Sequence, residues 1–104
     1  MIVNFQTDNH INGSEEVSGP LTALITKELN RFSGHITTLE VHLADENGDK
    51  KGENDKRCTI EAHVKGLKPV VATNHANTRD ESVKGAAIKL KSALDSLLGK
   101  LNHH

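Results

Sequence analysis

The chain has 104 residues, a formal net charge of −1 at pH 7 and one cysteine. This length suits one core, so we expect residues 1–104 to form a single domain, and one cysteine excludes an internal disulfide framework. The 13 basic residues stand against 14 acidic ones, which excludes the cationic surplus typical of nucleic-acid binders. The sequence has neither a signal-peptide pattern nor the roughly 18 apolar residues of a membrane span, so we expect a cytoplasmic protein.

The N-terminal segment predicts a strand followed by a helix. Residues 2–7 alternate between apolar and polar side chains, which is typical of a half-buried strand. Apolar residues then recur at helical spacing and predict a helix over residues 14–33. Pro20 falls in its second turn, where a proline removes a backbone hydrogen bond. The helix begins either at Ser18, or at Ser14 with a bend at the proline, and the apolar period favours the longer helix.

The remainder of the chain predicts three strands and a long helix. The alternating segments that predict strands are residues 36–44, 57–65 and 70–75. Residues 45–56 contain no apolar side chain and predict the solvated, mobile tip of a β-hairpin. The last helix is expected over residues 78–101, where Thr78 and Glu81 form a capping-box pattern ahead of an apolar stripe.

The element order is therefore β-α-β-β-β-α, which indicates an α+β fold. A strand–helix–strand start implies a right-handed crossover and a parallel first pair of strands. The following hairpins add two antiparallel strands. We therefore expect a four-stranded mixed sheet in chain order, with both helices on one face.

Two groups of basic residues are candidates for contacts with RNA phosphates. The helical group lies off the apolar stripes and consists of Lys84, Lys89, Lys91, Lys27 and Arg31. Asp95 interrupts this surface, so an ordinary solvated helix face remains the alternative. The second group lies at the base of the charged loop and at the next turn, and consists of Lys56, Arg57, Lys65 and Lys68. For this second group, pairing with the loop carboxylates is the favoured interpretation.

Other residue types that carry chemistry give weaker patterns. The histidines His42, His63 and His75 share the outward face of the predicted strands, but their spacing is not that of a metal motif. Exposed cross-strand Glu–His pairs are the simpler interpretation, so we predict no metal site and no cofactor. Cys58 alternates with Ile60 and should face the core, without the paired base that a catalytic cysteine needs. We therefore do not expect an enzyme.

Four segments suggest a family by their order and spacing. They are LEVHL at residues 39–43, KRCTIEA at 56–62, PVVAT at 69–73 and GAAIKL at 85–90. Together they resemble the ribosome-associated inhibitor and hibernation-promoting factor family, also called sigma-54 modulation or S30AE proteins. The resemblance covers nearly the whole chain and implies a fold like that of double-stranded-RNA-binding domains. It also implies binding to the small ribosomal subunit and inhibition of translation in stress or stationary phase.

The chain is similar to the short members of that family, so we expect a monomer without a C-terminal dimerisation domain. It departs from them in the last helix, where Ile88 stands at a usual Asp and Ser92 at a usual Arg. Our first hypothesis is a factor that binds small-subunit rRNA through the basic positions above. The alternative is a protein-docking module of the same fold that does not bind RNA. We expect neither DNA nor membrane as a partner.

Overall fold

The computed structural model describes residues 1–8, 15–46 and 55–102. Its elements are β1 (Ile2–Thr7), α1 (Glu15–Leu29), the 3-10 helix η1 (Asn30–Phe32), β2 (Ile36–Asp45), β3 (Lys56–Val64), β4 (Val70–Ala76) and α2 (Arg79–Asn102). This is the β-α-β-β-β-α order expected from the sequence. The predicted mobility of residues 45–56 concerns mainly 47–54, which lie outside the described residues.

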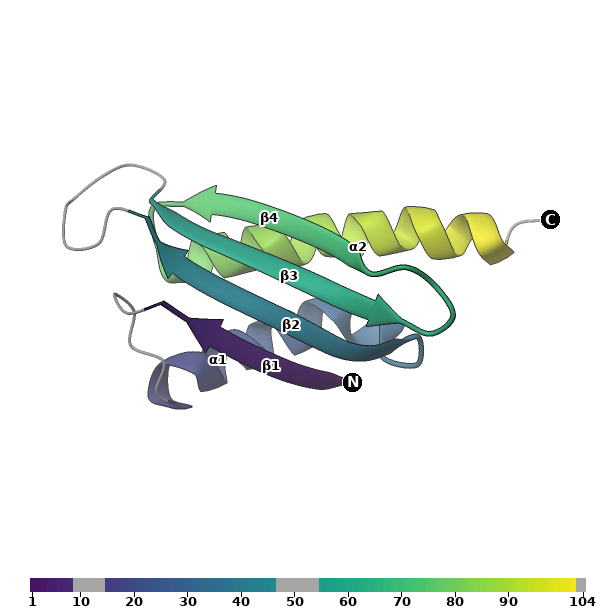
Figure 1. The fold of residues 1–104 in the computed structure, drawn as a ribbon, viewed down its shortest axis with the longest axis horizontal. Helices are drawn as coiled ribbons and strands as arrows, with labels where there is room; N and C mark the ends of the chain where they lie inside the picture. The colour runs from purple at the N-terminus through teal and green to yellow at the C-terminus, as the bar shows by residue number, and fades with distance from the viewer. Residues whose placement is uncertain (9–14, 47–54, 103–104) are drawn as a thin grey trace.

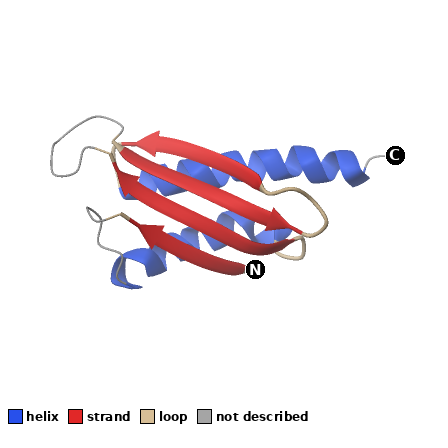
Figure 2. Ribbon diagram, in the orientation of Figure 1, coloured by secondary structure: helices blue, strands red, loops and turns tan. Residues whose placement is uncertain are grey.

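The four strands form one mixed sheet in the order β1-β2-β3-β4. β1 pairs with β2 in parallel, and the other two pairs are antiparallel. Both helices lie on the same side of the sheet and run in the same direction (Figures 1 and 2). The predicted α+β fold with two helices on one face is therefore confirmed, and none of the described helices covers the other face of the sheet.

The first helix contains Pro20 within it and begins at Glu15, so the alternative start at Ser18 is wrong. The prediction of one α-helix over residues 14–33 was also too long at its C-terminal end. The α-helix ends at Leu29, and η1 follows as one tighter turn closed by hydrogen bonds such as that from Ser33 N to Asn30 O at 3.0 Å.

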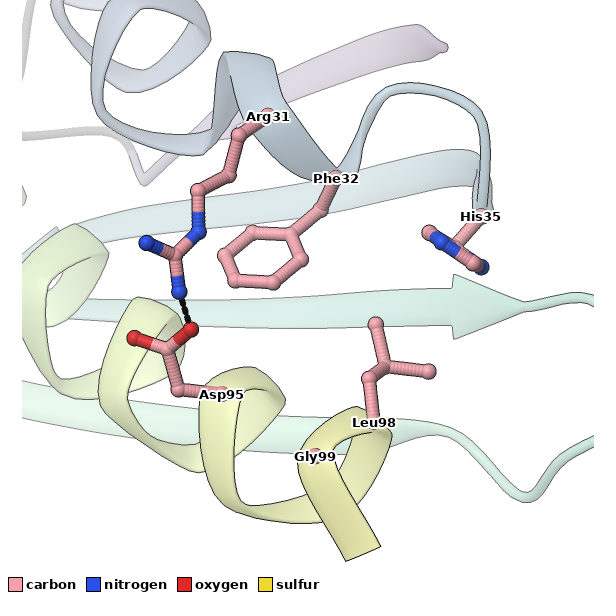
Figure 3. A pocket seen from close by; sticks show the side chains of 6 residues that line it. All are labelled: Arg31, Phe32, His35, Asp95, Leu98 and Gly99. Atoms are coloured by element: carbon pink, nitrogen blue, oxygen red, sulfur yellow. Dashed lines mark ion pairs between the residues drawn. The ribbon is translucent and has the colours of Figure 1, made fainter. Parts of the chain in front are cut away.

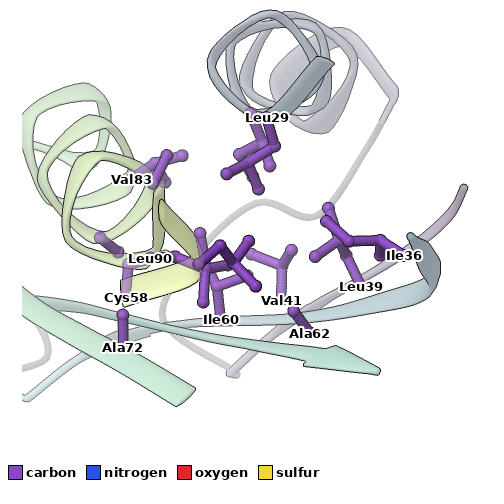
Figure 4. Close-up of a cluster of buried hydrophobic side chains, with 14 of the residues drawn as sticks. Leu29, Ile36, Leu39, Val41, Cys58, Ile60, Ala62, Ala72, Val83 and Leu90 are labelled. Carbon is purple, nitrogen blue, oxygen red and sulfur yellow. The ribbon is translucent and has the colours of Figure 1, made fainter. Parts of the chain in front are cut away.

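The core lies between the helices and the sheet and is built almost entirely from aliphatic side chains (Figure 4). Fully buried examples are Ile25, Leu39, Ile60 and Leu90, one from each of four elements. Burying a side chain of this size stabilises the fold by about 1.5–3 kcal/mol. Within the described part of the chain, no helix combines the length and the apolar character needed to cross a membrane.

A polar clamp joins the edge strand β4 to the start of α2. The Asn74 side-chain amide donates hydrogen bonds to the carbonyl oxygens of Glu81 and Ser82, each at 3.3 Å. Thr78 caps the helix, because its hydroxyl accepts a hydrogen bond from the N–H of Glu81 at 3.1 Å. The Asn74 amide occupies the space that a Cβ at Gly85 would need. Gly85 is thus the residue that lets strand and helix approach at this point.

Gly85→Ala should lower the free energy of unfolding by up to about 2 kcal/mol, because it displaces the Asn74 amide from two hydrogen bonds worth roughly 0.5–1.5 kcal/mol each, and the helix preference of Ala over Gly offsets about 1 kcal/mol of that loss. In an Asn74→Ala background, the same change should instead add up to about 1 kcal/mol, the helix preference of Ala over Gly. Urea unfolding of the single and double variants measures both values. Gly99→Ala is the matched control, since its Cβ meets nothing within 4 Å in the same helix. If the effects of Gly85→Ala and Asn74→Ala on the free energy of unfolding were additive in the double variant, the contact between Asn74 and Gly85 would be contradicted.

Cys58 lies fully buried in β3, as its alternation with Ile60 predicted, and burial raises the pKa of its thiol to about 12. The native protein should therefore react very slowly with thiol reagents at pH 8 and rapidly once denatured. Because the folded pKa lies above the ordinary 9.0, stability from this group is complete below pH 9 and falls as the pH rises toward 12. Thiol labelling with and without denaturant tests the burial, and Cys58→Ala should flatten this alkaline loss. Fast native labelling would contradict it.

Candidate nucleic-acid interface

Two of the predicted RNA-binding cations are unengaged on the helices. Lys84 on α2 and Lys27 on α1 are both exposed. Neither makes a hydrogen bond or an ion pair with another residue that the structure describes. Their ammonium groups are therefore available to an anionic partner without the loss of any internal contact.

The other three helical cations have partners within the protein. The ammonium nitrogen of Lys91 lies 3.9 Å from Glu28 Oε2, at the outer limit of an ion pair. Arg31 forms an ion pair with Asp95, and Lys89 donates a hydrogen bond to the backbone oxygen of Thr73 in β4 at 3.1 Å. The first two contacts join α1 and η1 to α2. Lys91 and Arg31 therefore lie where the two helical segments meet, with part of their charge compensated, whereas Lys89 is held at the edge of the sheet.

Charge is distributed unevenly along the two helices. The acidic residues in the first turn of α2 are Asp80 and Glu81, where they complement the positive end of the helix dipole. Further along, the helical side chains that the structure describes include the cations Lys27, Arg31, Lys84, Lys89 and Lys91 and the acids Glu28 and Asp95. The middle and C-terminal parts of the helical layer are therefore basic, although the whole chain is nearly neutral.

The second predicted group of cations is divided by the fold. Lys56 lies between Asp55 and Asp45, with N–O distances of 3.0 and 3.2 Å, and the Asp55 hydrogen bond raises the pKa of its ammonium. The pairing expected for this group is confirmed at Lys56. Arg57 pairs in register with His75 on the sheet face away from the helices. The last two, Lys65 and Lys68, are exposed in the turn between β3 and β4.

The uncovered face of the sheet brings two carboxylates together. Glu40 on β2 is the direct cross-strand partner of Glu61 on β3, an arrangement that is unfavourable for like charges. Each has a polar neighbour, since Glu40 accepts a hydrogen bond from the Asn4 amide at 3.0 Å and Glu61 lies 2.8 Å from His63 Nε2. This face therefore repels an anionic backbone near its centre.

Glu–His pairs are present at two of the three outward histidines, but Glu61 and His63 belong to the same strand, β3, so that pair is not the cross-strand pair that was predicted. Besides His63, His75 lies 2.7 Å from Glu46. His42 is exposed on the same sheet face. Among the residues that the structure describes, no three His, Cys, Asp or Glu side chains gather closely enough to hold a metal ion.

A pocket of about 280 Å³ opens where η1 meets the C-terminal part of α2 (Figure 3). Its lining residues are Arg31, Phe32, His35, Asp95, Leu98 and Gly99. Only Arg31 was a candidate from the sequence. The other five come from two segments that lie about 60 residues apart in the sequence. Asp95 was noted in the sequence only as an acidic residue that interrupts a basic helix face, and that pattern did not indicate that it would pair with Arg31.

Known structures share this fold. The N-terminal domain of Thermus thermophilus Protein Y superposes with a TM-score of 0.73 at 10% sequence identity, covering 93% of this chain and 99% of that one. A ribosomal subunit interface protein from Coxiella burnetii gives a TM-score of 0.71 at 15% identity, covering 95% and 99%. At such low identities the likeness shows the fold alone, and no curated protein sequence matches the chain.

The family itself is established by the sequence. A family model described as sigma 54 modulation protein / S30EA ribosomal protein matches residues 9–102, which is nearly the whole chain. This match agrees with the resemblance carried by the four sequence segments and with the fold. The chain therefore belongs to the sigma-54 modulation protein / S30EA ribosomal protein family.

Proposed function

We propose that this chain is a ribosome-associated factor that binds small-subunit rRNA through its helical layer and thereby restrains translation under stress or in stationary phase. Membership of a family described as ribosomal supports the ribosome as the partner. The likeness to a ribosomal subunit interface protein supports the same assignment. In this proposal the chain acts by occupying a site in the cytoplasm, without catalysis and as a monomer.

The observation that carries the RNA-binding part of the proposal is the unequal charge of the two sides of the molecule. Beyond the first turns, the side chains that the structure describes on the helical segments are five cations and two acids, and both acids already face a cation of the same layer. The opposite side presents the adjacent carboxylates Glu40 and Glu61. Contacts with phosphates supply most of the affinity for RNA, so the helical layer is the side that an rRNA backbone would favour.

Lys27 and Lys84 are the cations with which to test this surface. Lys89 and Lys91 have internal partners, so their reversal would change more than charge. The double variant Lys27→Glu/Lys84→Glu should fold normally, because exposed substitutions usually shift stability by within about 0.5 kcal/mol each. It should bind small subunits more weakly, and the slope of log K against log salt should fall by about two, one for each lost phosphate contact. Co-sedimentation with purified small subunits over a salt series measures both quantities.

The control variants compare the two faces of the molecule at equal change in charge. Lys84→Glu and Arg57→Glu each alter the net charge by two, but Arg57 lies on the sheet face away from the helices. We expect the first to weaken binding and the second to leave it nearly unchanged. Equal losses would mean that overall charge, and not this surface, governs association. Absence of wild-type co-sedimentation at low salt would overturn the proposal.

A protein-docking role is the second candidate, and one side chain favours it. Ile88 is a large apolar residue with 47% of its surface exposed on α2, at a position where an acidic residue is usual in this family. An isolated exposed isoleucine among cations suits contact with a protein better than contact with phosphates. Ile88→Asp separates the two functions, since it should abolish binding to an apolar protein surface but reduce salt-dependent rRNA binding only modestly.

A further inference from the structure

We propose that the pocket between η1 and α2 receives a single unstacked RNA base, which stacks on the guanidinium plane of Arg31. This inference rests on the proposed function and specifies the form of RNA that the helical layer selects. It predicts a preference for single-stranded or looped RNA, because the bases of a duplex are stacked within the helix and unavailable to a protein pocket.

The Arg31 guanidinium is held in place on two sides. Its central carbon lies over the Phe32 ring, 4.8 Å from the ring centroid. Its terminal nitrogen forms the ion pair with Asp95 across the pocket (Figure 3). The Arg31 side chain nevertheless keeps 58% of its surface exposed. A planar guanidinium that packs on an aromatic ring, is paired at one nitrogen and belongs to a mostly exposed side chain suits stacking on a base.

The ion pair argues against a simple phosphate contact at this position. Asp95 compensates the charge of Arg31, so the arginine offers less attraction to a phosphate than the unengaged Lys84 does. What remains is the flat, weakly hydrated surface of the guanidinium, which stacks on aromatic rings and on bases. Lysine would supply the same charge without that surface.

The remaining walls suit a flat ring with polar edges. Leu98 contributes an apolar side chain, and Gly99 has no Cβ to obstruct the opening. His35 lines the far end of the pocket, on the other side of Phe32 from Arg31 (Figure 3). The backbone of His35 is fixed, because its N–H donates to Phe32 O at 2.8 Å and its carbonyl accepts from Lys65 N at 3.0 Å. At about 280 Å³ the pocket is just below the usual 300–1,000 Å³ of ligand sites, so it suits one base.

The test compares a single-stranded RNA with a duplex of equal length by fluorescence anisotropy at fixed low salt. Stacking of one base is commonly worth a factor of about ten in affinity, so Arg31→Lys should lose about tenfold on the single strand and little on the duplex. Asp95→Asn provides the sharper contrast. If Arg31 only contacts phosphate, removal of the neighbouring acid should strengthen binding to both RNAs. If Arg31 stacks, loss of its anchor should lower the single-strand to duplex ratio.

A second measurement on the unmodified protein guards against variants that fold poorly. Single-stranded RNA carrying 4-thiouridine, irradiated in complex with the wild-type chain, should crosslink within residues 31–35 or 95–99. Crosslinks confined to other segments, or an unchanged ratio in both variants, would overturn the base pocket and leave the helical rRNA contact standing. Failure of the wild type to bind either RNA or the small subunit would overturn both.

Discussion

The close approach of α2 to β3 and β4 is the constraint on which the rest of this structure depends. The chain has no Trp or Tyr and only two Phe residues, so its core must exclude water with short aliphatic side chains. Ala62 and Ala72 on the sheet and Ala86 and Ala87 on the helix are all buried in that core. Such small residues let a helix lie near the sheet at the density of a protein interior. The position of α2 then determines where Lys91 and Asp95 meet α1 and η1.

A nearly neutral protein can still present a basic surface if its charges are sorted by the fold. Asp80 and Glu81 occupy the first turn of α2, while Lys84, Lys89 and Lys91 follow along that helix. The sheet contributes the opposing feature, since its uncovered face sets Glu40 against Glu61. The net charge of this chain is thus a poor guide to the charge of either surface, because it sums a basic helical side and a sheet face with two carboxylates at its centre.

The elements that alternate or repeat along the chain were predictable, and contacts between distant elements were not. The alternation that carries Cys58 and Ile60 identified β3 and its buried face, because each strand residue faces opposite to its neighbour. The 3-10 turn at Asn30–Phe32 was missed, since its residues continue the apolar period of α1. The Arg31–Asp95 ion pair was also missed, because it depends on how η1 lies against α2, and no periodicity records that relation. The pocket, which these two segments form together, could therefore not be predicted from the sequence.

The hydrogen bond from Lys89 to the Thr73 carbonyl has a consequence for solubility. β4 is an outer strand of the sheet, and outer strands expose unpaired backbone groups that recruit strands from other molecules. Lys89 places an ammonium group on one of these carbonyl oxygens. A strand from a second copy would have to displace a charged, hydrated group before it could add to the sheet. The same lysine that extends the basic helix surface therefore also guards this outer strand against edge-to-edge aggregation.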